Sequence, residues 1–165
     1  MELFSYDTPV DETGRTRRRF ESIEVGMRFE APAEATITEA QITGFAEQFD
    51  PQPMHLDAAA SHPLFTPPIA SGAHVFAVCH RMAVDACFEE LGLVGGVGID
   101  QLRWYAPLEP GMTIETVVEV TNRRRSATRE GRGYITLEVT GQTQADPPET
   151  LIEYATTGVV ETDTA

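Results

Sequence analysis

Two side chains able to move protons stand five residues apart in a segment that contains two prolines. Asp50 and His55 flank the run Pro51-Gln52-Pro53-Met54. A carboxylate and an imidazole act together on a substrate when both are held within hydrogen-bond reach of one reacting atom. Two prolines in three residues cannot continue a helix, so the pattern predicts a rigid loop. The segment is a candidate acid–base site; the alternative is that Asp50 caps a turn and His55 fills space.

A second candidate segment, Pro67-Pro-Ile-Ala-Ser-Gly72, opens the longest helical stretch of the chain. Ser71 can cap that helix, and a glycine at position 72 lets a ligand approach the backbone. The first N–H groups of a helix lack internal partners and lie at its positive end. They could bind the oxygen of a carbonyl that becomes an oxyanion. The alternative is an ordinary helix start, with Gly72 needed for close packing. His74 either lines the same site or is a core or interface histidine.

The elements that must hold these segments can be predicted from periodicity and caps. Thr38 and Gln41 form a capping-box pattern before a helix that ends near Gln48, and Asp57 can cap a short helix through Ala60. Residues 71–91 predict a helix that is nearly apolar all round in its first half, and therefore buried, with Gly92 at its end. Strands are predicted, from alternation and turn residues, at 28–37, 97–106, 112–122, 133–144 and 150–161. This order indicates an α+β fold in which an antiparallel sheet wraps a long central helix.

Length and composition exclude several classes of function. The 165 residues suit one domain at 20–165, preceded by a polar arm at 1–19, and the net charge of −14 with no lysine argues against nucleic-acid binding. No apolar run reaches the length of a membrane span, and the N-terminus does not resemble a signal peptide. Cys79 and Cys87 are too far apart on one helix for a disulfide. We therefore expect a cytoplasmic protein.

The candidate loop also resembles a known motif. Asp50-x-Gln52-Pro53-x-His55-x-Asp57 is similar to the Asp-x-Asn-Pro-x-His hydration motif of MaoC-like dehydratases and (R)-specific enoyl-CoA hydratases. The resemblance extends over about residues 20–161, through the segments Phe20–Phe29, Ile69–His74 and Leu102–Gly111. Gln52 stands where the family usually has Asn, and Phe49 where it often has Gly. The substrate therefore need not be a straight-chain enoyl-CoA.

The resemblance implies a hot-dog fold and a homodimer, with strands of two subunits joined in one sheet. Asp50 and His55 would activate water and handle the proton at the α-carbon, and the Gly72 N–H would hold the thioester oxygen. Gln52, Ser71 and His74 are expected to contact the substrate. The implied reaction adds water to, or removes it from, the 2,3 double bond of an enoyl-CoA, with a (3R)-hydroxyacyl product. Coenzyme A enters as part of the substrate, and no metal or other cofactor is expected.

Other interpretations remain open at this stage. A hot-dog acyl-CoA thioesterase and a non-catalytic acyl-binding subunit are the alternative functions. Asp50, His55 and Asp57 could in principle bind a metal, although the ligand spacing is not a recognised one. The arginines of the predicted hairpin 123–132, or the run 17–19, could hold the phosphates of coenzyme A or be solvated. Trp104 and Tyr105 alternate along a strand, so one is expected to pack in the core.

Overall fold

The computed structural model describes residues 17–57 and 68–163. Its helical elements are η1 (Phe20–Ser22), α1 (Glu39–Phe49), α2 (Pro53–Leu56), α3 (Gly72–Ala83) and η2 (Val84–Phe88). Its strands are β1 (Arg28–Glu30), β2 (Ala35–Thr36), β3 (Leu93–Trp104), β4 (Thr113–Arg125), β5 (Arg132–Thr143) and β6 (Thr150–Glu161).

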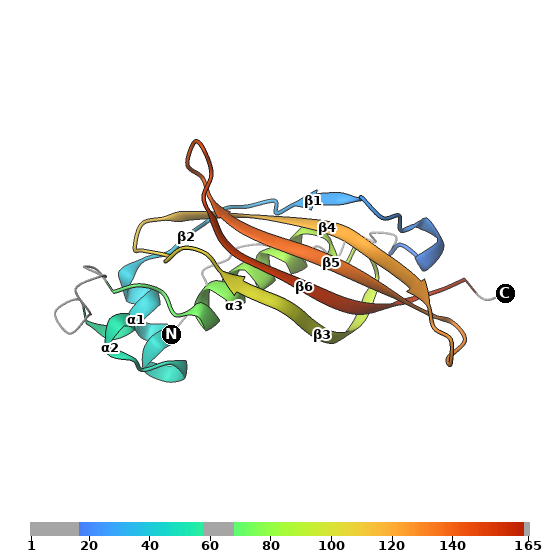
Figure 1. Cartoon of the computed structure of the whole chain (residues 1–165), viewed down its shortest axis with the longest axis horizontal. Coiled ribbons are helices and arrows are strands. Elements are labelled where there is room, and N and C mark those ends of the chain that lie inside the picture. The colour runs from blue at the N-terminus through green and yellow to red at the C-terminus, as the bar shows by residue number, and fades with distance from the viewer. Residues whose placement is uncertain (1–16, 58–67, 164–165) are drawn as a thin grey trace.

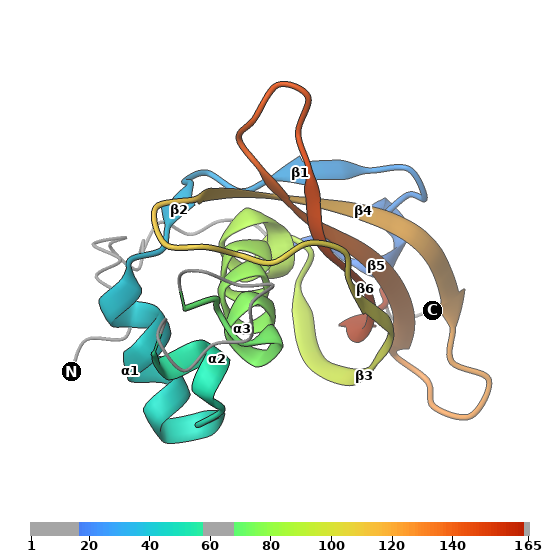
Figure 2. The same ribbon diagram turned by 60° about the vertical axis from the view of Figure 1, so that its left-hand side comes forward.

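One antiparallel sheet curves around the central helix α3 (Figures 1 and 2). The strands lie in the order β1-β4-β5-β6-β3, with β2 also paired to β4. Helices α1 and α2 lie beside the first turn of α3, at one end of the sheet (Figure 2). This architecture is the α+β hot-dog fold expected from the sequence, with β1 and β2 forming the strand predicted at 28–37 as two short pieces.

The core lies between α3 and the concave face of the sheet. Along β4 the buried residues alternate as predicted: Ile114, Thr116, Val118 and Val120 face inward. Alternation also buries the apolar side chains of β5, among them Leu137. Both central strands follow the period of two because one face of each packs on the helix and the other does not.

Local signals in the sequence account for most helix boundaries. Thr38 accepts a hydrogen bond from the Gln41 N–H, and the Gln41 side chain reaches back to Thr38, which completes the predicted capping box at α1. The long helix is regular only to Ala83; Val84–Phe88 forms a π-helical turn, and Gly92 ends the segment with φ of +65°. The segment predicted as a helix over 71–91 is therefore helical only to Phe88, and its last turn is π-helical because the backbone widens into i to i+5 hydrogen bonds there.

The predicted loop after Asp50 contains a short helix. Pro53 begins α2, at the first helical position, where its missing N–H costs no hydrogen bond. The two prolines do end α1, as expected, but the second one also starts a new turn. Asp57 follows that turn, and the helix that it was predicted to cap, through Ala60, lies outside the described residues.

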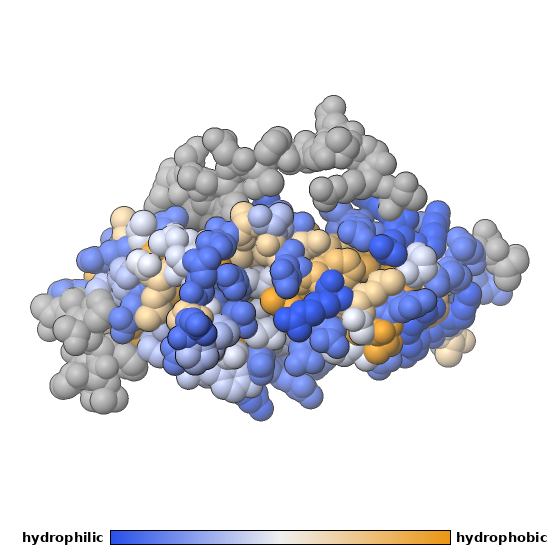
Figure 3. Space-filling model, turned by 90° about the horizontal axis from the view of Figure 1, so that it is seen from above, coloured by the Kyte–Doolittle hydropathy of each residue, from blue (hydrophilic) through white to orange (hydrophobic). Residues whose placement is uncertain are grey.

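Strand β3 forms one edge of the sheet and is exposed over most of its length. Trp104 and Tyr105 are 51% and 58% exposed, so the expectation that one of them packs in the core is wrong. The reason is that β3 has a neighbouring strand on one side only and shifts register against it between Asp100 and Arg103. The surface drawn in Figure 3 is mostly hydrophilic, with apolar residues gathered near its middle.

Two further predictions can be compared with the described residues. Cys79 and Cys87 are both buried and unpaired, as expected from their spacing. Within 17–57 and 68–163, no helix combines the length and the apolar composition needed to cross a membrane.

Candidate active site

Asp50 lies directly after the last turn of α1. Its N–H donates to the Ala46 carbonyl at 2.9 Å, which fixes the backbone at this point. The side-chain amide of Gln52 donates to Asp50 Oδ1 at 2.7 Å. A carboxylate only accepts hydrogen bonds, so this contact determines which end of the Gln52 amide faces it. Gln52 therefore orients Asp50, a role beyond the substrate contact that the sequence predicts for it.

His55 points inward from α2, and its side chain is 5% exposed. Its Nδ1 lies 2.7 Å from the Ile69 carbonyl oxygen. A carbonyl can only accept, so the proton of this hydrogen bond resides on Nδ1. When the ring carries a single proton, Nε2 is then left with a free lone pair. That Nε2 faces Asp50 Oδ2 at 3.6 Å.

This separation between Nε2 and Oδ2 determines what the pair can do. It exceeds the 2.7–3.2 Å typical of a direct hydrogen bond between nitrogen and oxygen. With the proton of His55 on Nδ1, both facing atoms are acceptors. The geometry therefore suits a third group with two protons to donate, such as a water molecule.

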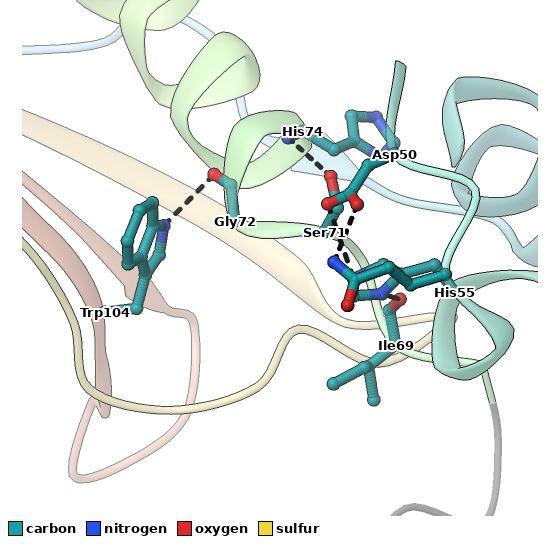
Figure 4. A network of polar contacts seen from close by, with 8 residues as sticks. Asp50, His55, Ile69, Ser71, Gly72, His74 and Trp104 are labelled. Carbon is teal, nitrogen blue, oxygen red and sulfur yellow. Dashed lines mark hydrogen bonds and ion pairs between the residues drawn. The ribbon is translucent and has the colours of Figure 1, made fainter. Parts of the chain in front are cut away.

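The start of α3 adjoins this pair (Figure 4). Ser71 is buried, and its Oγ accepts from the His74 N–H at 3.2 Å, which confirms the predicted cap. Gly72 is the first residue of the helix, so its N–H has no partner within the helix. The structure thus brings together five of the predicted site residues where α2 and α3 meet, namely Asp50, Gln52, His55, Ser71 and Gly72.

Trp104 is a site residue that the sequence did not reveal. Its indole Nε1 donates to the Gly72 carbonyl at 3.0 Å, across 32 positions of sequence. A Cβ at residue 72 would lie 2.6 Å from Trp104 Cε2. The indole lies on the side of Gly72 away from Asp50 and His55 (Figure 4). The only sequence signal was indirect, because Trp104 falls within the family-like segment Leu102–Gly111.

His74 lies one turn into α3 and is 1% exposed. Its ring stacks on Phe45 of α1, with centroids 4.5 Å apart. Burial lowers the pKa of the His74 imidazole to about 4, so the ring is neutral at pH 7. Within the described part of the chain its Nδ1 has no hydrogen-bond partner. A neutral, buried ring of this kind does not donate a proton as an imidazolium, and its contact with a substrate stays a prediction.

The arginines of the hairpin between β4 and β5 lie at the opposite end of the sheet from α1 and α2 (Figures 1 and 2). Arg123 stacks over Phe20, with its guanidinium carbon 4.2 Å from the ring centroid. Arg124 stacks over Tyr134 in the same way, at 4.3 Å. These contacts hold the entry segment and the strand surface together. Packing on an aromatic ring is neither of the two interpretations given for these arginines from the sequence, and their contact with coenzyme A stays a prediction.

Two arginines of the run 17–19 form ion pairs with glutamates. Arg18 pairs with Glu90 at 2.9 Å, and Arg19 pairs with Glu161 at 2.6 Å. As for metals, the described residues contain no group of three or more His, Cys, Asp or Glu side chains arranged to hold an ion.

Comparisons with known proteins agree with this fold. The profile of the family described as "MaoC like domain" matches residues 20–143. A MaoC-like dehydratase from Rhodospirillum rubrum is 31% identical, with a TM-score of 0.78 over 90% of this chain and 99% of that one. The R-hydratase PhaJ1 from Pseudomonas aeruginosa is 22% identical, with a TM-score of 0.65 over 87% of this chain and 85% of that one, which shows a shared fold.

A curated relative was also found. The uncharacterized protein YdeM of Bacillus subtilis (strain 168) is 29% identical over 89 residues. The match covers 53% of this chain and 63% of YdeM, so just under two thirds of that relative is spanned.

Proposed function

The chain belongs to the MaoC-like domain family, and on that premise we propose that it is a hydro-lyase acting on acyl thioesters. It adds water to the 2,3 double bond of an enoyl-CoA, or removes water from the corresponding (3R)-hydroxyacyl-CoA. The observation that carries this proposal is the pair of acceptors, Asp50 Oδ2 and His55 Nε2, that face each other at 3.6 Å.

A water molecule between these two atoms donates one hydrogen bond to each. Its oxygen lone pairs are then free to face the β-carbon of the substrate. As the oxygen attacks, one of the two acceptors takes a proton from the water, and a proton is delivered to the α-carbon from the same pair. The hydrogen bonds from Gln52 to Asp50 and from His55 to Ile69 fix both groups before the substrate arrives. Such preorganisation lowers the cost of reaching the reactive geometry.

Negative charge develops on the thioester oxygen during this addition. The N–H of Gly72, at the positive end of α3, is the donor proposed to hold it. The indole of Trp104 covers Gly72 on its other side and fixes the first turn of the helix. Coenzyme A is part of the substrate in this scheme, and the chemistry requires no other cofactor.

We further propose a homodimer in which β3 pairs with a second copy of the chain. The support is that β3 is the edge of the sheet, with Val97 60% and Ile99 44% exposed. An exposed apolar edge strand tends to pair with another strand. Val97→Lys is expected to shift the protein toward the monomer in size-exclusion chromatography with light scattering.

Burial of both unpaired cysteines agrees with a reducing, cytoplasmic setting.

The proposal is tested by assaying hydration of crotonyl-CoA together with release of free thiol on the same sample. Asp50→Asn and His55→Ala each remove one member of the acid–base pair. Each is expected to lower kcat/KM by about 100- to 10,000-fold. That range corresponds to about 2.7–5.4 kcal/mol of transition-state stabilisation. Glu47→Gln is the matched control, because it removes an exposed carboxylate from α1, one turn before Asp50.

A panel of straight-chain, branched and dicarboxylic enoyl-CoA substrates extends the assay, because Gln52 departs from the usual motif. Thiol release without hydration would identify a thioesterase instead. Binding without turnover on the whole panel would identify an acyl-binding subunit. Full activity in both the Asp50 and the His55 variants would refute the mechanism.

A further inference from the structure

The indole of Trp104 lies against the first turn of α3, on the side of Gly72 away from Asp50 and His55 (Figure 4). Its Cε2 and Cζ2 atoms would lie 2.6 and 2.8 Å from a Cβ at residue 72, so only glycine admits the ring at this distance. Its Nε1 donates to the Gly72 carbonyl. The indole is therefore fixed beside Gly72 through the carbonyl, and the N–H of Gly72 stays available to a ligand.

The strand before Trp104 adopts an unusual backbone that aims this side chain. Gln101 has a φ of +56°, in the left-handed region that non-glycine residues seldom adopt. The pairing of β3 with β6 shifts register between Asp100 and Arg103, and after the shift Trp104 pairs with Ile152. Such a bulge redirects the side chains that follow it. Strained backbone persists where the surrounding structure enforces it, often at functional sites, which points to a role for the indole.

A thioester at this site is open to attack by water at two carbons. In the proposed reaction, water held between Asp50 and His55 adds to the β-carbon. In hydrolysis, a water oxygen instead bonds to the carbonyl carbon, the carbon–sulfur bond breaks, and the sulfur leaves with the bonding electrons and takes a proton from that water. The N–H of Gly72 would stabilise the oxyanion of either reaction. Access of water to the carbonyl carbon therefore decides between hydration and hydrolysis.

We propose that the indole of Trp104 contacts the bound thioester and keeps water away from its carbonyl carbon, a role that rests on the proposed function. The β-carbon faces the acid–base pair, so the flank of the thioester turned away from that pair faces Trp104. A tryptophan ring covers a large apolar area. The side chain is 51% exposed, so part of it meets solvent while the rest covers Gly72. Trp104 thus determines that the site adds water to the double bond and does not release the thiol.

The first measurement is release of free thiol from butyryl-CoA, whose saturated chain cannot be hydrated. Trp104→Ala should release thiol faster than the wild type, by roughly tenfold or more, because water reaches the carbonyl carbon. Trp104→Leu should do the same and serves if the alanine variant does not fold. Trp104→Phe keeps an aromatic ring without the Nε1 donor, and its thiol release should stay near that of the wild type.

Tyr105→Ala is the matched control. It removes the neighbouring aromatic side chain, which is 58% exposed and points to the opposite side of the chain. The Tyr105 hydroxyl donates to Glu153, away from the start of α3. Thiol release from butyryl-CoA should be unchanged in this variant.

The second measurement uses Trp104 as its own reporter, because it is the only tryptophan of the chain. Acrylamide quenches the fluorescence of an indole that it can reach. Saturating butyryl-CoA should lower the quenching constant of the wild type, because the bound thioester covers part of the half-exposed ring.

A purely structural role for Trp104 gives a different result. Loosening Gly72 alone would weaken the oxyanion donor and slow both hydration and hydrolysis. Thiol release at or below the wild-type rate in the alanine and leucine variants would therefore overturn the proposal, as would an equal rise in Tyr105→Ala. An unchanged quenching constant would overturn it too. Absence of crotonyl-CoA hydration by the wild type would reject the proposed function, whereas thiol release from butyryl-CoA would still decide the role of Trp104.

Discussion

Adding one methyl group to Gly72 tests the contact between the start of α3 and the end of β3. The new Cβ would lie 2.6 Å from Trp104 Cε2, whereas ordinary contacts begin at 3.4 Å. The indole must retreat by at least 0.8 Å. Its hydrogen bond to the Gly72 carbonyl, now 3.0 Å long, is then lost. Such a bond contributes about 0.5–1.5 kcal/mol to the free energy of unfolding.

A second effect has the opposite sign. Replacing glycine by alanine at a compatible position stabilises a protein by about 0.4–1 kcal/mol, because the unfolded chain loses freedom. When Trp104 is present, Gly72→Ala loses this hydrogen bond and also strains the displaced, half-exposed indole. The substitution should therefore lower the free energy of unfolding by about 1 kcal/mol. In a Trp104→Ala background the obstacle is gone, and the same substitution should stabilise by about 0.5 kcal/mol.

The double-mutant cycle should therefore show a coupling energy of about 1.5 kcal/mol between the two positions. Urea unfolding followed by circular dichroism measures it, because Trp104 is the only tryptophan and its fluorescence is lost in half of the variants. In the single variant Gly72→Ala, tryptophan emission should also shift to the red. Additive effects, within about 0.5 kcal/mol, would refute the claimed contact.

Three further outcomes are expected. Ser71→Ala should lower the free energy of unfolding by about 1 kcal/mol in urea titrations, because α3 loses its cap; an unchanged midpoint would contradict the capping role. The pKa of His74 is about 4 in the folded protein against 6.5 in the unfolded chain, so the unfolded chain binds more protons between these values. Unfolding free energy should then fall as pH drops through this window, by at most about 1.4 kcal/mol per pH unit, and His74→Phe should remove that part of the slope. Burial raises the pKa of the Cys79 and Cys87 thiols to about 12, so neither should react with a thiol reagent at pH 8 until urea unfolds the protein.

The sequence by itself determined the local features. The cap at Thr38, the cap at Ser71 and the glycine turn at Gly92 were all predictable, because each depends on residues three or four positions apart. The alternation along β4 was predictable for a similar reason, since it reflects a backbone period of two. The rigid connection between Asp50 and His55 follows from prolines that restrict the chain wherever it folds. Together these features fixed the elements of the hot-dog fold and the candidate acid–base pair.

Only the tertiary structure decided how that pair is held and what surrounds it. The Ile69 carbonyl that fixes the proton of His55 comes from 14 residues away, and the indole over Gly72 comes from 32 residues away. Both contacts depend on where separate elements meet in space, which no local pattern encodes. The exposure of Trp104 likewise follows from the position of β3 at the sheet edge, a property of strand order. Residue types and spacing thus indicated the candidate acid–base pair, and long-range packing determined its orientation.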